Sequence, residues 1–410
     1  MENLLKFDQE IANLILKEQE REDYSIRLIP SENYVSKAVR EATGSILTNK
    51  YSEGYPKKRY YEGQENIDAI EELAINRAKE LFGSYGANVQ ALSGAPANLG
   101  VMLGLLKPGD KIMGMALPHG GHLTHGWKVS ATGIFFESVQ YELNPETSML
   151  DYDMIRDLAL KEKPKLIIAG SSAYPRTIDF KKFREIADEA GAYLLSDMAH
   201  IAGLVAGGVH PSPVPHSHVV TTTTHKTLRG PRGGMVLMSK GFVRKVNKGI
   251  FPGLQGGPHN HTTAAIAVAL KEAMQESFKK YAKQIIKNAE VLANELINYG
   301  FDLVTGGTDN HLMLIDLTNK NISGKELSTA LNKVHIVTNA NSVPFDKRPP
   351  MDPSGIRIGT PAVTTKGMKE DEMKQIAKWI DEVSKNLNNE TVLNKIAEEV
   401  KEFSLKFKLD

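Results

Sequence analysis

Residues 219–234 read VVTTTTHKTLRGPRGG, and this stretch decides the fold. The apolar, β-branched run at 219–222 predicts a buried strand, and Lys226 follows shortly after it. At the end of a buried strand an ammonium group loses hydration, which lowers its pKa and leaves more neutral amine to attack a carbonyl. Lys226 is therefore a candidate Schiff-base lysine; the alternative is an ordinary lysine whose side chain extends to solvent.

A second strand end lies upstream, where the short apolar run Tyr193–Ser196 leads into Asp197. Ligands of open α/β sheets bind at the carboxyl ends of the strands, so a carboxylate there is well placed to contact a ligand. An acid beside a lysine-bound pyridoxal phosphate keeps the pyridine nitrogen protonated. Asp197 and Lys226 follow successive predicted strands, which fits one cofactor across the sheet edge. Taken alone, Asp197 is equally well read as a helix N-cap or a surface carboxylate.

The rest of the chain alternates predicted strands and helices, which indicates a mostly parallel sheet covered by helices on both faces. Further strands are expected at Lys111–Met115, Ile134–Val139, Leu166–Ala169, Met235–Met238 and Met313–Leu317, and helices at 67–82, 181–190 and Gly324–Lys333. We predict a three-layer α/β/α large domain and a smaller C-terminal α/β domain. The expected limits are 1–45 for an N-terminal helix and arm, 46–277 for the large cofactor-binding domain and 278–410 for the small domain.

Composition excludes several classes of protein. The 410 residues carry a net charge of +1, so nothing suggests binding to nucleic acid or to an anionic membrane. There is no cysteine, which rules out disulfides and a catalytic thiol. Neither a membrane span nor a signal-peptide core is apparent, and we expect a cytoplasmic protein.

Two glycine-rich loops could bind ligands. Small residues at Ser93, Gly94 and Ala95 precede an apolar helical run, an arrangement that can point backbone N–H groups at a phosphate or form a plain packed turn. The loop PHGGHLTHG at 118–126 contains three histidines, but their spacing does not match a usual zinc pattern and no carboxylate lies nearby in sequence. We therefore predict no metal site.

Six separated motifs occur in order and together resemble the serine hydroxymethyltransferase family: LTNKYSEGYPKKRYYEGQE, HGGHLTHG, SDMAH–AGLVA, TTTTHKT–GPRGG, GGTDNHL and SGIRIGTP. The resemblance runs from about Leu28 to about Pro361. It implies the fold type I of pyridoxal-phosphate enzymes, that of aspartate aminotransferase. The implied reaction is reversible transfer of the serine hydroxymethyl group to tetrahydrofolate, which gives glycine and 5,10-methylenetetrahydrofolate.

The resemblance also implies a cofactor site, with pyridoxal 5'-phosphate held as an aldimine on Lys226. The other cofactor-binding residues would be Ser93, Gly94, Ala95, His122, Ser172, Asp197, His200, Thr223, His225 and, from a partner subunit, Gly257. The family usually has a serine where this chain has Ala95, so one hydroxyl donor to the phosphate is missing. A hydrogen bond to a charged group contributes about 1.5–3 kcal/mol.

By the same resemblance, Ser31 and Arg357 bind the substrate carboxylate. Tyr51, Glu53 and Tyr61 would enter the site from the partner subunit, which makes a homodimer with shared active sites the smallest catalytic unit. Besides Lys226 and Asp197, the residues with expected catalytic roles are Glu53, as the acid or base near the substrate hydroxyl, His225, Tyr61 and Arg232. The expected folate-binding residues are Leu117, Gly121, His122, Leu123, Asn341, Pro349, Pro350 and Met351.

Other functions remain open at this point. Ala95, and Pro30 where the family more often has alanine, leave room for a pyridoxal-phosphate aldolase on β-hydroxy amino acids of the threonine or allo-threonine type, or for transfer to another pterin. A homologue retained only as a binding or regulatory protein is a third alternative. The presence of both Lys226 and Asp197 favours an enzyme.

Overall fold

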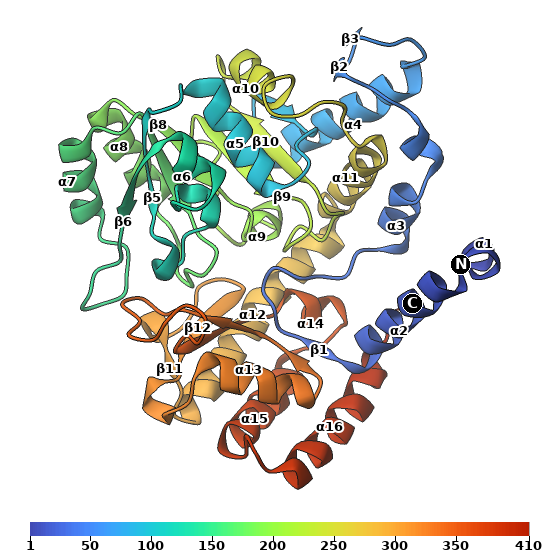
Figure 1. The fold of residues 1–410 in the computed structure, drawn as a ribbon, viewed down its shortest axis with the longest axis vertical. Coiled ribbons are helices and arrows are strands. Elements are labelled where there is room, and N and C mark those ends of the chain that lie inside the picture. Colours follow the sequence, from blue (N-terminus) through green and yellow to red (C-terminus); the bar gives the residue numbers. More distant parts are fainter. Residues whose placement is uncertain (410) are drawn as a thin grey trace.

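The computed structural model describes residues 1–409 and contains two α/β bodies, drawn one above the other in Figure 1. The larger body is built on a seven-stranded sheet. Strand β10 runs antiparallel to both of its neighbours and the remaining pairs are parallel, which confirms the predicted mostly parallel sheet. In spatial order the strands are β4 (Gly86–Asn88), β10 (Gly234–Met238), β9 (Val219–Thr223), β8 (Tyr193–Asp197), β7 (Leu166–Gly170), β5 (Lys111–Met115) and β6 (Glu137–Tyr141).

Helices cover both faces of this sheet, so its central strands are buried throughout. Alternate side chains of a strand point to opposite faces: in β7, Ile167 packs in one core cluster and Ile168 in another. One face is covered by α4 (Glu65–Phe82), α7 (Tyr152–Glu162), α8 (Phe180–Ala190), α9 (Ala202–Ala206) and α11 (Asn260–Ala273), and the other by α5 (Gly94–Leu105) and α10 (Val243–Ile250). This is the three-layer arrangement that the alternation predicted.

One predicted strand is wrong in its bounds. In place of a strand at Ile134–Val139, the chain forms helix α6 (Ala131–Phe135) and only then strand β6. Gly133 allows helix α6 to pack closely against the preceding chain, because a Cβ there would lie 2.4 Å from the Trp127 carbonyl oxygen. A short apolar run does not distinguish helix from strand by itself. The other predicted strands and helices are confirmed to within one or two residues, and α4 ends at Gly83, which has a φ of 68°.

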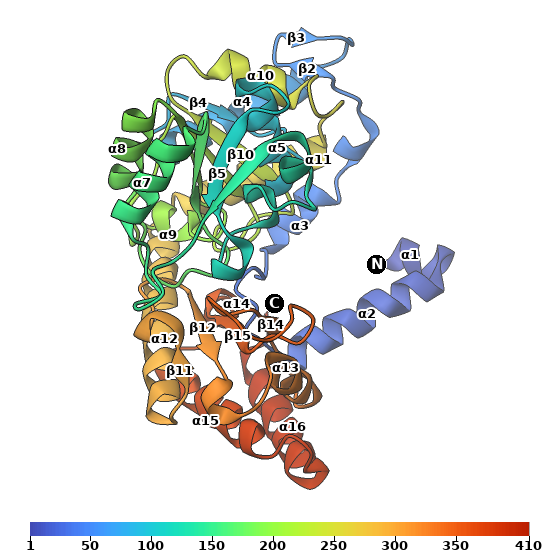
Figure 2. The same ribbon diagram turned by 60° about the vertical axis from the view of Figure 1, so that its left-hand side comes forward.

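The smaller body is built on an antiparallel sheet in the order β11 (Asp302–Leu303), β12 (Leu312–Asp316), β15 (Gly355–Gly359) and β14 (Asn339–Asn341). Three helices pack with it: α13 (Gly324–Lys333), α15 (Glu370–Lys385) and α16 (Glu390–Ser404). Helix α12 (Glu276–Asn298) joins the two bodies: Phe278 packs in the core of the larger one and Leu292 in the core of the smaller one (Figure 2). The predicted limit between 277 and 278 falls inside this helix and stays a prediction.

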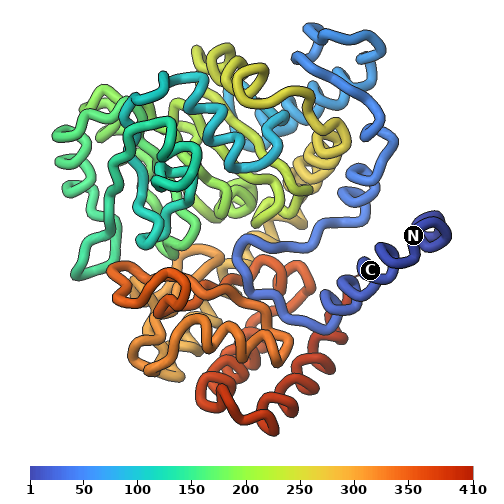
Figure 3. Tube along the Cα trace, viewed as in Figure 1, coloured from blue at the N-terminus to red at the C-terminus, as the bar shows by residue number. Residues whose placement is uncertain are grey.

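The N-terminal segment belongs to the smaller body. Helices α1 (Glu2–Phe7) and α2 (Gln9–Tyr24) extend away from the rest of the protein, and the apolar side chain of Leu14 on α2 is 61% exposed. Strand β1 (Ile26–Arg27) then pairs in parallel with β13 (Ile336–Val337). From there the chain crosses to the larger body, as the tube in Figure 3 shows, and forms α3 (Lys37–Thr43) and a hairpin of β2 (Gly54–Tyr55) and β3 (Lys58–Arg59). Across residues 1–409, no helix combines the length and apolar character needed to cross a membrane.

Candidate active site

A cavity of about 760 Å³ lies at the carboxyl ends of the parallel strands and receives residues from both bodies. Most of the predicted site residues line it: Ser31, Ser93, Gly94, Ala95, Leu117, Gly121, His122, Leu123, Ser172, Asp197, His200, Thr223, His225, Lys226, Arg232, Asn341, Pro350 and Arg357. A neighbouring cavity of about 870 Å³ shares Ser31, His225 and Arg232 with the first. The predicted residues Tyr51, Glu53, Tyr61, Gly257, Pro349 and Met351 lie outside the first cavity.

Lys226 sits in the turn that follows β9, with only 9% of its surface exposed, so the alternative of a side chain that extends to solvent is wrong. Burial lowers the pKa of its amine from 10.5 to about 8; the Asp197 charge opposes this shift and the Arg357 charge adds to it. The Lys226 carbonyl oxygen accepts hydrogen bonds from the Asn33 side chain (2.9 Å) and the Arg229 N–H (3.1 Å). The turn therefore holds a buried amine that is partly neutral near pH 7.

Asp197 ends strand β8 and keeps its negative charge. Burial raises the pKa of its carboxyl, but the hydrogen bonds from His125 and Asn98 and the electrostatic effect of the two nearby imidazole rings outweigh burial and hold the pKa below its usual range. His125 Nε2 lies 3.0 Å from Asp197 Oδ2, and the Asn98 amide donates to the same oxygen at 2.8 Å. Asp197 Oδ1 accepts the Ala199 N–H. The sequence alone did not reveal the roles of His125, which stands in the histidine loop, and of Asn98, which lies in α5 just after Ser93, Gly94 and Ala95.

The histidines around the cavity are neutral. Burial lowers the pKa of His122 to about 4 and that of His225 to about 3. The rings of His200 and His311 stack with centroids 5.5 Å apart, and burial lowers the pKa of His311 to about 3. His311 is a further residue that the sequence reasoning missed, although it belongs to the GGTDNHL motif. In the part of the chain that the structure describes, no group of three His, Cys, Asp or Glu side chains is arranged to hold a metal ion.

Arg357 comes from β15 of the smaller body and brings a positive charge into the cavity, where burial lowers the pKa of its guanidinium to about 10. Nη1 donates to the Ser172 carbonyl oxygen (2.6 Å), and Nε and Nη2 lie 3.4 and 3.3 Å from Asn339 Oδ1. Among residues 1–409 no carboxylate pairs with it, so Arg357 is not held in a structural salt bridge there. A buried cation without a counter-charge is costly, which favours binding of an anion here.

The start of α5 faces the same cavity. Its first helical residues are Gly94 and Ala95, and the first N–H groups of a helix have no partner within the helix, so they can donate to a phosphate. A Cβ on Gly94 would lie 2.7 Å from Thr223 Cγ2, so a larger residue would clash with β9. Free helix N–H groups, a partly neutral amine and an ionised carboxylate within one cavity fit pyridoxal phosphate.

The predicted partner-reaching residues lie together on another surface. Tyr61 donates its hydroxyl to Glu53 Oε2 (2.8 Å), and Tyr51 packs edge-on against Tyr61. Gly257 belongs to the same patch, because a Cβ there would lie 3.3 Å from the Tyr51 ring. Tyr51 is 61% exposed and Tyr61 is 44% exposed. The predicted residues of hairpin and loop therefore form one exposed cluster.

The predicted folate-binding residues divide into two groups. Leu117, Gly121, His122, Leu123, Asn341 and Pro350 line the cavity, and Trp127, which the sequence reasoning missed, lines it as well. Met351 is 83% exposed on the loop beside it. Asn341 lies on strand β14, whose three residues pair with β15. The sequence did not predict this strand, because the polar run Asn339–Asn341 gives no periodic signal.

Comparison with known proteins identifies close relatives over almost the whole chain. A family model described as serine hydroxymethyltransferase matches residues 4–380. A protein of Acidothermus cellulolyticus named serine hydroxymethyltransferase is 63% identical over 377 residues, which cover 92% of this chain and 88% of that protein. Proteins of the same name from Desulfotalea psychrophila and Sorangium cellulosum are 61% and 59% identical, over 99% and 97% of this chain and 96% and 94% of their own lengths.

Proposed function

The chain belongs to the serine hydroxymethyltransferase family, and we propose that Lys226, Asp197 and Arg357 form the centre of its active site. The enzyme transfers the hydroxymethyl group of serine to tetrahydrofolate and leaves glycine. The observation that carries the assignment of the site is the convergence of a buried amine, an ionised carboxylate and an unpaired guanidinium on one cavity. The alternative of an aldolase is not favoured by the relatives.

Pyridoxal phosphate, when bound, supplies the electron sink that allows the Cα–Cβ bond of serine to break. Lys226 would hold the cofactor through its amine, since a pKa of about 8 leaves a useful neutral fraction near pH 7. Asp197, which remains ionised, would keep the pyridine nitrogen of the cofactor protonated, and His125 and Asn98 hold the carboxylate in place for that role. The helix N–H groups at Gly94 and Ala95 compensate in part for the hydroxyl that Ala95 lacks.

Arg357 binds the serine carboxylate, with Ser31 beside it. A guanidinium presents parallel N–H donors that match the two oxygens of a carboxylate. The Arg357 fork is already oriented by the Ser172 carbonyl and the Asn339 amide oxygen. The carboxylate would supply the counter-charge that this cation lacks, and it would place the serine Cα beside Lys226.

The active enzyme is a homodimer in which each copy completes the other's site. Tyr51, Glu53, Tyr61 and Gly257 lie outside their own chain's cavity and are clustered on an exposed surface, which supports a role across an interface. Glu53 would accept the proton of the serine hydroxyl as the Cα–Cβ bond breaks. Residues around Leu117, Leu123 and Asn341 would bind the pterin, and the cytoplasm is the proposed location.

The test is formation of glycine from serine by the purified protein, with and without tetrahydrofolate. Folate-dependent turnover that disappears in Lys226→Ala supports the proposal, and Lys58→Gln, an exposed lysine on the β3 strand, serves as the control. Equal glycine formation without folate, together with cleavage of allo-threonine at a similar rate, would establish the aldolase alternative instead.

A further inference from the structure

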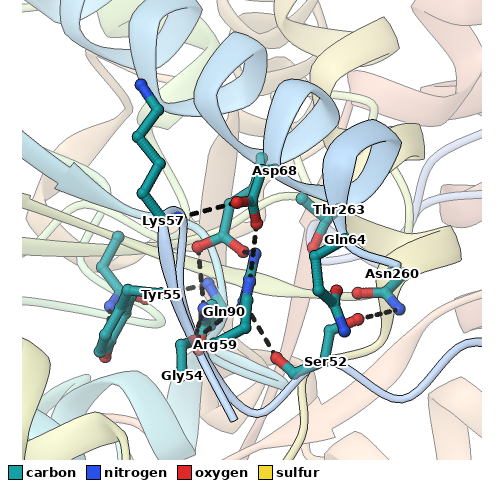
Figure 4. Close-up of polar contacts among 12 residues, drawn as sticks. Ser52, Gly54, Tyr55, Lys57, Arg59, Gln64, Asp68, Gln90, Asn260 and Thr263 are labelled. Carbon is teal, nitrogen blue, oxygen red and sulfur yellow. Dashed lines mark hydrogen bonds and ion pairs between the residues drawn. The ribbon is translucent and has the colours of Figure 1, made fainter. Parts of the chain in front are cut away.

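The short segment that carries Tyr51 and Glu53 is anchored by side chains from inside the protein, and Figure 4 shows the contacts around Ser52 and Gly54 on either side of Glu53. Side-chain donors bind the backbone carbonyls on both sides of Glu53, so the conformation of the segment is fixed by side chains as well as by backbone hydrogen bonds. The bonds run from Asn260 to the Lys50 oxygen (2.6 Å), from Gln64 to the Tyr51 oxygen (3.0 Å), from Arg59 to the Ser52 and Gly54 oxygens (2.9 Å each) and from Gln90 to the Gly54 oxygen (2.9 Å).

Arg59 is the centre of this arrangement. Its side chain is 3% exposed, and Nη1 binds the carbonyls immediately before and after Glu53. Nη2 donates to Glu71 (2.6 Å) and Nε to Asp68 (2.9 Å), both on helix α4. Because the guanidinium is planar and rigid, anchoring one edge to α4 fixes the other edge against the backbone of Glu53.

Gln90 connects the same segment to the glycine-rich loop that contains Gly257. Its side-chain amide is buried and donates to the Gly54 oxygen and to Glu71 Oε1 (2.8 Å). Its own carbonyl oxygen accepts a hydrogen bond from Gln255 (2.6 Å). The two segments touch, since a Cβ on Gly256 would lie 3.1 Å from Glu53 Oε1. We call residues 50–61 together with 253–258 the platform.

We propose that Arg59 and Gln90 are positioning residues that fix the Glu53 carboxylate before two copies associate, so that each chain offers its partner a preformed platform. This inference rests on the shared site of the proposed function. An exposed loop without internal anchors would have to be ordered during docking, at a cost in conformational entropy. Displacement of a reacting group by about 1 Å costs about a hundredfold in rate, so the anchors act on turnover through Glu53.

The test uses mixed dimers, made by co-expressing two differently tagged chains and purifying the species that carries both tags. In a dimer of Arg59→Lys with Lys226→Ala, the only site with a lysine receives its platform from the chain with an intact Arg59. We expect the Arg59→Lys homodimer to lose about a hundredfold in kcat, and the mixed dimer to regain wild-type kcat in its one complete site. A dimer of Glu53→Gln with Lys226→Ala should behave in the same way.

The outcomes separate the inference from its premise. If the Glu53→Gln pair regains activity and the Arg59→Lys pair does not, Arg59 acts within its own chain or on its folding, and the inference is overturned. If neither pair regains activity, the shared site itself is refuted and the inference with it. Gln90→Met, which keeps the side-chain volume but removes the donor, gives a second test if Arg59→Lys fails to fold.

A second readout does not depend on turnover. Amide hydrogen exchange of the peptide covering residues 50–62 should be faster in Arg59→Lys and Gln90→Met, while peptides of the smaller body keep their wild-type rates. Lys161→Gln changes an exposed residue of α7, outside the platform, and should leave both exchange and kcat unchanged. Unchanged exchange at 50–62 in the two positioning variants would show that the platform needs neither anchor.

Discussion

In the cofactor-free protein, the amine of Lys226 should titrate near pH 8, and substitution of two of its charged neighbours, one negative and one positive, should move its pKa in opposite directions. At pH 7, a pKa of about 8 leaves about one amine in ten neutral, whereas the ordinary value of 10.5 leaves about one in three thousand. The cavity therefore raises the reactive fraction by about 300-fold. Burial is the largest cause, so neither neighbour alone should account for the whole shift.

The perturbations are Arg357→Met and Asp197→Asn. Arg357 is positive and lowers the pKa of Lys226, so its removal should raise that pKa and reduce the reactivity of the amine at pH 7. Asp197 is negative and opposes the shift, so its neutralisation should lower the pKa further and increase the reactivity. Each unit of pKa changes the neutral fraction about tenfold while the pH stays well below the pKa.

Trace acetylation followed by peptide mass spectrometry measures this directly, because only the neutral amine reacts. The rate of acetylation at Lys226 should rise with pH and level off above about pH 8. A wild-type inflection near 10.5 would refute the account of burial. A shift of the same sign in both variants would refute the account of the two charges, since a general loosening of the cavity would move both toward the ordinary value.

Three further predictions concern binding and stability. Lys226→Met should stabilise the cofactor-free protein at pH 7 by at most about 3 kcal/mol in chemical denaturation. The reason is that Lys226 keeps its proton up to about pH 10.5 in the unfolded chain but releases it near pH 8 in the folded one. The stability of the wild-type protein therefore rises between about pH 8 and 10.5, and the advantage of the variant should vanish above that window. Arg357→Lys keeps the charge but loses the planar fork, and it should raise the KM for serine by about 10- to 150-fold in steady-state assays at saturating tetrahydrofolate; an unchanged KM would contradict the carboxylate assignment. Leu292→Ala opens a cavity in the fully buried core of the smaller body and should cost about 2–5 kcal/mol in urea denaturation without altering the KM for serine.

The ends of the parallel strands were predictable from sequence for a physical reason. Strands buried on both faces are continuous apolar, β-branched runs, and the polar residues that follow them lie at one edge of the sheet. That is how Asp197 and Lys226 could be placed in one site from the order of residues alone. The roles of most other site residues came from the motifs, because nothing in the local pattern of Ser31 or Asn341 announces a ligand.

What the sequence did not reveal depends on contacts between distant residues. His125 and Asn98 reach Asp197 across 72 and 99 residues, and only the packing of α5 and the histidine loop against β8 brings them there. The pairing of β1 with β13 places the N-terminal segment on the smaller body, a contact that two-residue strands cannot announce by periodicity. The helix at Ala131–Phe135 was not predicted, because its apolar residues fit the period of a helix and that of a strand equally well.

The side chain of Asn33 connects the two bodies at the turn that carries Lys226, and all of its donors and acceptors form hydrogen bonds. Asn33 donates to the Lys226 carbonyl oxygen and to the Tyr281 hydroxyl, and it accepts hydrogen bonds from the Tyr34 N–H and the Thr365 hydroxyl. Tyr281 lies on α12, and Thr365 ends the helix α14 (Pro361–Thr365) that follows the arginine strand. Motion of the smaller body, which carries Arg357, is thereby coupled to the turn that carries Lys226. A carboxylate on Arg357 and an amine at Lys226 must act on one substrate, and the Asn33 hydrogen bonds link the parts of the chain that carry these two groups.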